Sequence, residues 1–218
     1  TIPLQGDIGA VVDQLLSVLQ AMPDEQAQQR SVWLDSCAAS KAAWKSFLHQ
    51  RQSTPPLFDE VWQRNVLTQP AAIKVVCDFA NEVQAIKFFD AGDVQANGFQ
   101  TVEDDSTGQT YTESGASYMG FATCAVTAAG MASTQQYPIA FTGDGSFMMN
   151  PQALISAIEH KARGTIVIFD NRRMAAISSL QHAQYGKDFR TNDAVAVDYV
   201  QLAGSVKGVQ ALWGGEDT

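Results

Sequence analysis

The chain has 218 residues, of which 45% are hydrophobic and 17% are charged. This composition supplies enough apolar material for a buried core and argues against a disordered chain. The formal net charge is −9 at pH 7 and no basic run is present, which argues against a nucleic-acid partner and against docking on an anionic membrane. An anionic cofactor would therefore need a metal ion or backbone amides to bind here.

The cysteines and the chain start bear on the cellular compartment. The three cysteines share no ligand-like spacing, which favours free thiols in a reducing environment. No segment has the apolar length of a membrane span, and the first residues have no signal-peptide architecture. The chain starts at Thr1 rather than Met, which we interpret as a processed, excised or engineered N-terminus. We expect a cytoplasmic protein.

Two helical patterns come first along the chain. Apolar residues recur at helical spacing within residues 4–20 and again from about residue 30 to residue 50. The segment Ser53-Thr54-Pro55-Pro56 breaks the second pattern. We therefore expect an N-terminal helical segment over residues 1–54 and a separate domain over residues 55–218.

From about residue 57 onward, predicted helices alternate with short apolar strands. The predicted helices cover residues 71–83, 117–132, 151–163 and 194–204, the predicted strands cover residues 85–89, 139–142, 165–169 and 208–212, and residues 98–111 are expected to form a polar loop. Strands that are apolar throughout and are separated by helices indicate an α/β fold. The expected architecture is a mainly parallel sheet with helices on both faces.

Ligands of such sheets lie at the carboxyl ends of the strands, where the loops gather. Three polar segments follow predicted strands: Asp90-Ala91-Gly92, Gly143-Asp144-Gly145 and Asp170-Asn171. The sequence therefore predicts that the chemistry is at these three strand ends.

The second and third of these segments together suggest a cation site. Glycines allow positive φ and close approach of the backbone, so that amides can face a phosphate while the Asp144 carboxylate faces a metal. In a right-handed strand–helix–strand unit, Asn171 would reach the same edge of the sheet as Asp144. Carboxylate and carboxamide oxygens suit Mg²⁺, whereas no Cys/His cluster is present for zinc. A Gly-Asp-Gly turn on its own also serves turn geometry.

These residues carry a resemblance to a known family. Gly143-Asp144-Gly145-Ser146-Phe147-Met148-Met149-Asn150, followed by Asp170-Asn171, resembles the signature of thiamine-diphosphate enzymes, including the flanking strands and the intervening helix. Ser117-Tyr118-Met119-Gly120-Phe121 resembles the segment whose bulky apolar residue supports the cofactor in a bent V shape. The resemblance covers about residues 57–213.

The resemblance implies a thiamine-diphosphate-binding fold with thiamine diphosphate and Mg²⁺ as cofactors. The metal would be bound by the Asp144 and Asn171 side chains and by the backbone carbonyl of Arg173. For Met119, helix packing is an alternative role. The residues implied in cofactor binding are Gly92, Ser117, Met119, Gly143, Asp144, Gly145, Ser146 and Asn171.

The N-terminal segment also resembles part of this family. Residues 1–20 are similar to the tail of the central domain that precedes this module in the acetolactate-synthase-like branch. Residues 1–54 would then be that tail plus a helical linker, and the chain would be the C-terminal part of a longer polypeptide. Whether FAD also binds cannot be read from this chain, because the flavin site would lie in the central domain.

The implied activity is cleavage or formation of a carbon–carbon bond next to a carbonyl. The substrate would be a small molecule, either a 2-oxo acid or a cyclic 1,2-dione. The family activates its cofactor with a glutamate from a pyrimidine-binding domain, and we find no such domain here. The resemblance therefore implies that this domain comes from the same gene or from another subunit, in a homodimer or tetramer. The chain alone is expected to be inactive, and its catalytic residues stay unknown.

Short matches suggest a branch of the family. Phe169-Asp170-Asn171, Ile177-Ser178-Ser179-Leu180-Gln181, Phe189-Arg190 and Glu113-Ser114-Gly115 are similar to trihydroxycyclohexanedione hydrolases. Acetolactate-synthase-like carboligases and 2-oxoacid decarboxylases are the alternatives.

Three departures from the family pattern keep a second hypothesis open. Asp170 replaces the usual first Asn, Arg172-Arg173 stand where small glycines often follow, and Asp93 lies where diphosphate contacts are often made. A non-catalytic or degenerate relative, acting as a regulatory or assembly module, would explain them. We interpret Arg172, Arg190 and His182 as solvated surface groups. The alternative for either arginine is contact with an anionic substrate, and the alternative for His182 is proton transfer to the substrate. A nicotinamide-binding oxidoreductase would need a Gly-x-Gly-x-x-Gly turn, and none is present.

Overall fold

The computed structural model describes residues 3–22, 27–132, 136–192 and 195–215. The chain divides into two compact units, Thr1–Phe47 and Leu48–Thr218. No helix of the described residues is long and apolar enough to cross a membrane.

The first unit contains the two predicted N-terminal helices. Helix α1 covers Ile8–Ala21 and begins after Asp7, whose carboxylate accepts a hydrogen bond from the Ala10 amide at 3.0 Å, as an N-cap residue does. Helix α2 covers Ala27–Gln52 and continues into the second unit. The division falls inside α2, whereas the sequence suggests residues 54/55. The assignment of residues 1–54 to a central-domain tail and linker stays a prediction.

After the end of α2, the second unit forms a small hairpin that the sequence does not predict. Strands β1 (Leu57–Asp59) and β2 (Arg64–Val66) pair in antiparallel fashion, with Asp59 opposite Arg64. Three-residue strands are too short to produce a recognisable alternation of apolar and polar residues. Helix α3 (Gln69–Glu82) follows.

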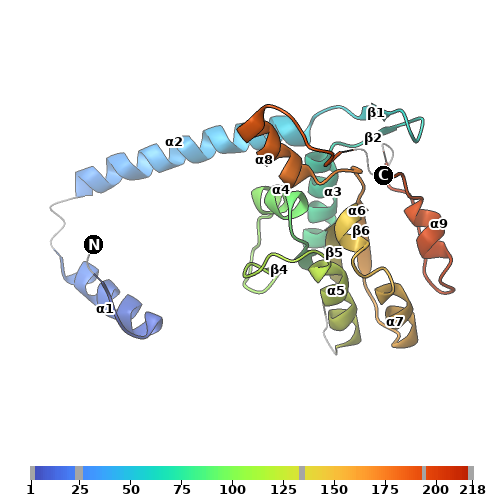
Figure 1. The fold of residues 1–218 in the computed structure, drawn as a ribbon. Helices are drawn as coiled ribbons and strands as arrows, with labels where there is room; N and C mark the ends of the chain where they lie inside the picture. The colour runs from blue at the N-terminus through green and yellow to red at the C-terminus, as the bar shows by residue number, and fades with distance from the viewer. Residues whose placement is uncertain (1–2, 23–26, 133–135, 193–194, 216–218) are drawn as a thin grey trace. The chain divides into compact units, whose positions relative to one another are not determined.

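The main sheet has four parallel strands in the order β4-β3-β5-β6. Three of them, β4, β5 and β6, are labelled in Figure 1. Their bounds are β3 Ile86–Phe89, β4 Thr110–Thr112, β5 Pro138–Gly143 and β6 Thr165–Phe169. The remaining helices are α4 Asp93–Thr101, α5 Phe121–Met131, α6 Asp144–Phe147, α7 Ala153–Glu159, α8 Ala175–Tyr185 and α9 Tyr199–Gly204.

Helices cover both faces of the sheet, as predicted. One core cluster joins alternate strand residues, among them Phe89, Phe141 and Phe169, to apolar side chains of α3 and α4. The other joins Phe88, Ala140 and Ile166 to Ala122 and Val126 of α5. Successive strand residues therefore point to opposite faces that are both covered by helices, which explains why β3, β5 and β6 are mainly apolar. The predicted α/β class with a parallel sheet and a preceding helical segment is confirmed.

Only residues 102–109 of the predicted loop 98–111 are irregular, because α4 extends to Thr101 and β4 occupies Thr110–Thr112. Gly98 misleads the sequence analysis. A Cβ on Gly98 would lie 2.2 Å from Cε1 of Phe89. This glycine therefore allows α4 to approach the sheet closely and does not end the helix.

Three other predicted elements differ in extent or kind. Helix α5 begins only at Phe121, because Ser117 and Gly120 have left-handed backbones with φ of 54° and 95°. Residues 208–212 form no strand: Gly208 has φ of 105°, outside the range of β structure, and Leu212 is 78% exposed. The predicted helix 194–204 is observed from Tyr199, while its first residue lies outside the described residues.

Candidate functional site

The strand order places a topological switch point between β3 and β5. From β3 the chain passes through α4 to β4 on one side, then returns through α5 to β5 on the other side of β3. Connections on the two sides leave the sheet toward opposite faces, and ligands of open α/β sheets bind in the crevice this creates. Gly92 follows β3, and Gly143 ends β5. The predicted segments therefore flank the position where the fold opens.

Asp90, at the end of β3, has a fully buried carboxylate that serves the architecture. Its oxygens accept hydrogen bonds from the Gly120 amide at 2.8 Å, the Thr142 hydroxyl at 2.8 Å and the Ala91 amide at 3.1 Å. Burial raises the pKa of this carboxyl group, and the hydrogen bonds oppose that shift. Asp90 thereby fixes β3, β5 and the start of α5 to one another.

The segments around Met119 and Gly145 are in direct contact. A Cβ on Gly145 would lie 3.2 Å from Cε of Met119, and a Cβ on Gly120 would lie 3.1 Å from Cβ of Met149. Gly143 has an ordinary φ of −78°, and Gly145 is not among the residues with positive φ. The expectation that these glycines provide positive φ is therefore wrong. At Gly145, the glycine provides room for the Met119 side chain.

The strand ends at Asp144 and Asp170 meet at the same edge of the sheet. Gly143 of β5 is paired in register with Phe169 of β6, so the two following residues are neighbours. Burial raises the pKa of Asp144, opposed by hydrogen bonds from the amides of Gly145 and Arg172. Burial also raises the pKa of Asp170, and the charge of Asp144 raises it further. Negative charge is therefore concentrated at this edge.

The turn after β6 is held by its own side chains. The Asp170 carboxylate accepts a hydrogen bond from the Arg172 amide at 3.3 Å, and the Asn171 carboxamide oxygen accepts one from the Arg173 amide at 3.0 Å. The Arg173 side chain extends to Asn192, with Nε 2.7 Å from Oδ1. Because the Arg172 amide also donates to Asp144, the turn that contains Asn171 lies against the β5 end.

The remaining predicted cofactor residues lie around these strand ends. Ser146 is buried in α6, with 4% of its surface exposed. Gly92 is exposed, with φ of 94°, just before α4. Ser117 is exposed in the loop after β4, where the Glu113 carboxylate accepts hydrogen bonds from the amides of Gly115 at 2.6 Å, Ala116 at 3.0 Å and Ser117. In this structure Ser117 is organised by Glu113.

Asp93 faces protein partners at the start of α4. Its Oδ2 accepts a hydrogen bond from Asn97 Nδ2 at 3.1 Å, and Arg51 donates to Oδ1 of the same asparagine at 2.8 Å. Burial raises the pKa of Asp93, while the charges of Arg51 and Arg173 lower it. The negative charge of Asp93 is therefore partly compensated by two arginines.

The sequence analysis misses two residues of this region and misjudges a third. Arg172 is only 20% exposed and forms an ion pair with Asp59 of β1, with Nη2 2.6 Å from Oδ2, so its interpretation as a solvated charge is wrong. Burial, followed by the charges of Asp144 and Asp170, raises the pKa of Tyr199 to about 12. No local motif marks Asp59 or Tyr199, because each reaches the site only through the tertiary fold. His182 is exposed, as expected.

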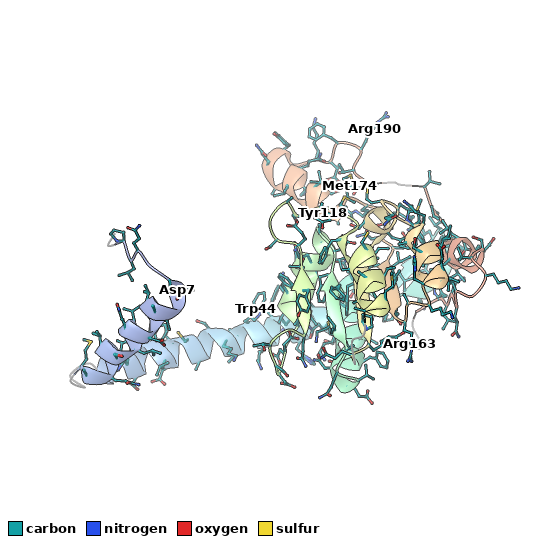
Figure 2. All side chains as sticks on the ribbon, turned by 90° about the horizontal axis from the view of Figure 1, so that it is seen from below. Asp7, Trp44, Tyr118, Arg163, Met174 and Arg190 are labelled. Carbon is teal, nitrogen blue, oxygen red and sulfur yellow. The ribbon has the colours of Figure 1, made fainter. Side chains whose placement is uncertain are left out.

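Figure 2 shows the side of the second unit on which the β6 turn lies. Tyr118, next to Met119, and Met174, which directly follows the turn, are drawn on the same side of this unit, whereas Arg163, before β6, lies well away from them. Tyr118 and Met174 are both more than half exposed. The loops after β4 and β6 thus bring apolar side chains to the surface near the strand ends.

The donor set fits a hard cation and an anionic group. Mg²⁺ usually takes one or two protein oxygens and completes its octahedron with water and phosphate. Asp144 and Asn171 would supply such oxygens, and a cation would relieve the repulsion between Asp144 and Asp170. In the described ranges, no three His, Cys, Asp or Glu side chains form a metal-binding group. Gly145 has no side chain beside these oxygens, and a Cβ there would lie 3.2 Å from Cε of Met119.

Comparison with known proteins shows the family of this chain. The family model described as "Thiamine pyrophosphate enzyme, C-terminal TPP binding domain" matches residues 90–214. A 3D-(3,5/4)-trihydroxycyclohexane-1,2-dione hydrolase of Lacticaseibacillus casei is 37% identical over 97 residues, which are 42% of this chain and 15% of that protein. A probable acetolactate synthase large subunit of Methanocaldococcus jannaschii is 28% identical over 220 aligned residues, covering 96% of this chain and 34% of that protein.

Two solved structures that share the fold are decarboxylases, one of them thiamine diphosphate-dependent. A thiamine diphosphate-dependent 4-hydroxybenzoylformate decarboxylase of Rhodococcus jostii RHA1 superposes with a TM-score of 0.58 at 22% identity, over 65% of this chain and 27% of that one. A benzoylformate decarboxylase from Polynucleobacter necessarius gives 0.59 at 15% identity, over 67% of this chain and 28% of that one. The chain thus spans between 15% and 34% of the curated relatives named above. It belongs to the thiamine pyrophosphate enzymes, as a carrier of their C-terminal cofactor-binding domain.

Proposed function

We propose that this chain provides the diphosphate- and magnesium-binding part of an enzyme that cleaves or forms a carbon–carbon bond next to a carbonyl. The observation that carries the proposal is the meeting of two strand ends beside the switch point. There the Asp144 carboxylate lies against the turn that contains Asn171, and Met119 lies against Gly145.

Each of these residues has a proposed role in holding the cofactor. Asp144 and Asn171, with the backbone carbonyl of Arg173, would bind Mg²⁺. Ser146 and the glycine segments Gly92 and Gly143–Gly145 would hold the diphosphate through hydroxyl and amide groups. Met119 would support the bent cofactor, and Ser117 would contact it from the same loop. Bound Mg²⁺ offsets the anionic diphosphate, which the net charge of −9 would otherwise repel.

The bound cofactor supplies a nucleophilic carbon and an electron sink, while the protein supplies orientation and electrostatics. The half-buried carboxylates of Asp144 and Asp170 would place negative charge beside the metal ion that binds the diphosphate. Exposed Tyr118 and Met174 would exclude water from a substrate approaching over the β4 and β6 loops. Activation of the cofactor is assigned to a glutamate of a pyrimidine-binding domain, as the family resemblance implies.

This division of roles predicts that the chain needs a partner domain, from the same polypeptide or from another subunit of a homodimer or tetramer. Steady-state turnover of 2-oxo acids or cyclic 1,2-diones by the purified 218-residue chain is expected to be absent. Adding a pyrimidine-binding domain from the same gene should restore it. Measurable turnover by the chain alone would contradict this part of the proposal.

Two substrate classes are compatible with the comparisons. The identity of 37% to a cyclic-dione hydrolase favours a ring-opening reaction, although it covers only 42% of this chain. The match to a probable acetolactate synthase covers 96% of this chain at lower identity and favours a 2-oxo acid. The assembled enzyme, assayed with both classes under identical conditions, would distinguish them.

Cofactor binding can be tested without turnover. We expect the chain to bind thiamine diphosphate in the millimolar range only when Mg²⁺ is present, as measured by titration calorimetry. Asp144→Ala should weaken this binding at least about tenfold, because it removes a charged metal ligand. Asp78→Ala is the matched control, since Asp78 is an exposed carboxylate of α3 paired with Lys74.

A different result would favour the degenerate module. If millimolar thiamine diphosphate does not bind with Mg²⁺, even after the pyrimidine-binding domain is added, the chain would have kept the fold and lost the cofactor. If Asp144→Ala and Asp78→Ala bind equally well, the cation would lie elsewhere.

A further inference from the structure

Arg172 carries an ion pair that the family signature does not include. Its guanidinium Nη2 lies 2.6 Å from Oδ2 of Asp59, and the two side chains are 20% and 14% exposed. Asp59 ends β1, and its Oδ1 also accepts hydrogen bonds from the amides of Val61 and Trp62, each at 2.9 Å. The carboxylate is therefore fixed by its own hairpin before it contacts the arginine.

The backbone of Arg172 is as unusual as its side chain. Its φ is 52°, in the left-handed region that non-glycine residues rarely occupy. This conformation directs the Arg172 amide to the Asp170 carboxylate, at 3.3 Å, and toward Asp144. The side chain leaves in the direction of the hairpin. One residue thus contributes its amide to the turn after β6 and its charge to Asp59.

The charges around this arginine are unevenly matched. Asp59, Asp144 and Asp170 all interact electrostatically with the Arg172 guanidinium. Only Asp59 forms a direct ion pair with it among the described residues. Without Asp59, the guanidinium would still interact with Asp144 and Asp170. A guanidinium bound there would compete with a divalent cation for the same oxygens.

We propose that Asp59 is a positioning residue that keeps the Arg172 guanidinium away from the Asp144–Asn171 cation position. The inference rests on the proposed function, because it presupposes that a cation binds there. The hairpin β1–β2 then has a defined role, because its carboxylate balances the arginine that stands where small residues often follow the signature. Arg172 places a cationic side chain next to the proposed cation site, and Asp59 of the distant β1–β2 hairpin neutralises that side chain.

The test measures metal binding and needs no activity. Mn²⁺ serves as the probe, because the electron paramagnetic resonance signal of the free ion disappears when it binds. The full chain is titrated with Mn²⁺ at saturating thiamine diphosphate. Asp59→Asn should weaken Mn²⁺ binding about tenfold, because the released guanidinium competes for the site. The double variant Asp59→Asn/Arg172→Gly should bind within about threefold of the wild type.

The double variant separates positioning from simple structural support. Glycine suits the left-handed backbone at residue 172, so this substitution does not strain the turn. If Asp59 only anchored the hairpin, removal of the arginine would not rescue binding, and both variants would be equally weak. Glu60→Gln removes a charge from an exposed side chain of the same hairpin and should leave binding unchanged.

The outcomes distinguish the two proposals. If the wild-type chain does not bind Mn²⁺ in the presence of thiamine diphosphate, even after the pyrimidine-binding domain is added, the proposed function fails and this inference fails with it. If wild type binds and Asp59→Asn binds equally well, only the inference is overturned. Weak binding by Asp59→Asn without rescue in the double variant also overturns it. Circular dichroism and urea unfolding of each variant confirm that loss of binding is not loss of folding.

Discussion

Two aspartates that follow neighbouring strands of the same sheet have opposite environments. Asp90, after β3, is completely buried, and three donors from β5, α5 and its own turn occupy its carboxylate. Asp144, after β5, is only half-buried and faces a second carboxylate, Asp170. The function of a residue therefore cannot be inferred from its position at a strand end alone. A carboxylate already satisfied by the protein holds the fold together, whereas an incompletely compensated one is available to a ligand.

The largest expected effect tests this contrast through stability. Asp90→Ala should lower the free energy of unfolding by about 3 kcal/mol, because the Gly120 amide and the Thr142 hydroxyl lose their buried acceptor. Asp144→Ala should change it by less than about 1 kcal/mol, because the loss of amide contacts is offset by relief of repulsion with Asp170. Urea unfolding followed by circular dichroism measures both. Equal losses in the two variants would remove the distinction.

The sequence predicts the layout of the site better than its details. Mainly apolar strands of four to six residues reveal the parallel sheet, because helices cover both of its faces. Lys87 of β3 is an exception, since it is buried and forms an ion pair with Asp104. The register of β5 and β6 then brings Asp144 and the Asp170–Asn171 segment together, as the strand–helix–strand pattern predicts. The predictions that are wrong are those that depend on how side chains pack. Gly98 looks like a loop residue until the Phe89 ring is placed beside it.

Residues from distant segments are the other part that the sequence does not reveal. Asp59 lies 113 positions before Arg172, on a hairpin too short to be recognised from periodicity. The sequence shows an arginine where the family pattern often has a small residue. The residues next to Arg172 in the sequence do not indicate that it forms an ion pair. Tyr199 is similar, since its proximity to Asp144 and Asp170 depends on how α9 folds back. Long-range electrostatic pairs of this kind follow from the tertiary structure alone.

The next effect is smaller and concerns pH. Burial raises the pKa of Asp90 above its ordinary value of 3.8, so folding favours the protonated carboxyl. The stabilisation of the folded state by protonated Asp90 is fully present below pH 3.8 and is lost as the pH rises through the folded-state pKa. Asp90→Asn lacks this dependence. The unfolding free energy of the wild type should therefore fall relative to that of Asp90→Asn as the pH rises from about 4 to about 7, measured by urea unfolding at each pH.

A constant difference between wild type and Asp90→Asn over this range would mean that the pKa of Asp90 is the same in the folded and unfolded states. A difference that changes in the opposite direction would mean that the three hydrogen bonds to the carboxylate outweigh its burial. Either result would still leave the structural role of Asp90 open to the alanine test, because that test does not depend on ionisation.

The smallest expected effect on stability is at Gly145, which lies next to Asp144 in the proposed ligand site. Gly145→Ala would place a Cβ 3.2 Å from Cε of Met119, the end of a flexible side chain that can move by a few tenths of an ångström. We expect the unfolding free energy to fall by less than about 1 kcal/mol. Affinity for thiamine diphosphate with Mg²⁺ should fall about tenfold, because the displaced methionine is the proposed support of the cofactor.

The variant Met119→Ala separates the two consequences of this contact. In the Met119→Ala background, Gly145→Ala should cost almost nothing in stability, because the clashing methyl group is gone. Cofactor affinity should be low in both Met119→Ala variants, with or without alanine at position 145. If Gly145→Ala instead weakens binding in that background as much as in the wild type, its effect acts directly on the amides that would face the diphosphate. Met119 would then be a packing residue of the loop before α5 rather than a support for the cofactor.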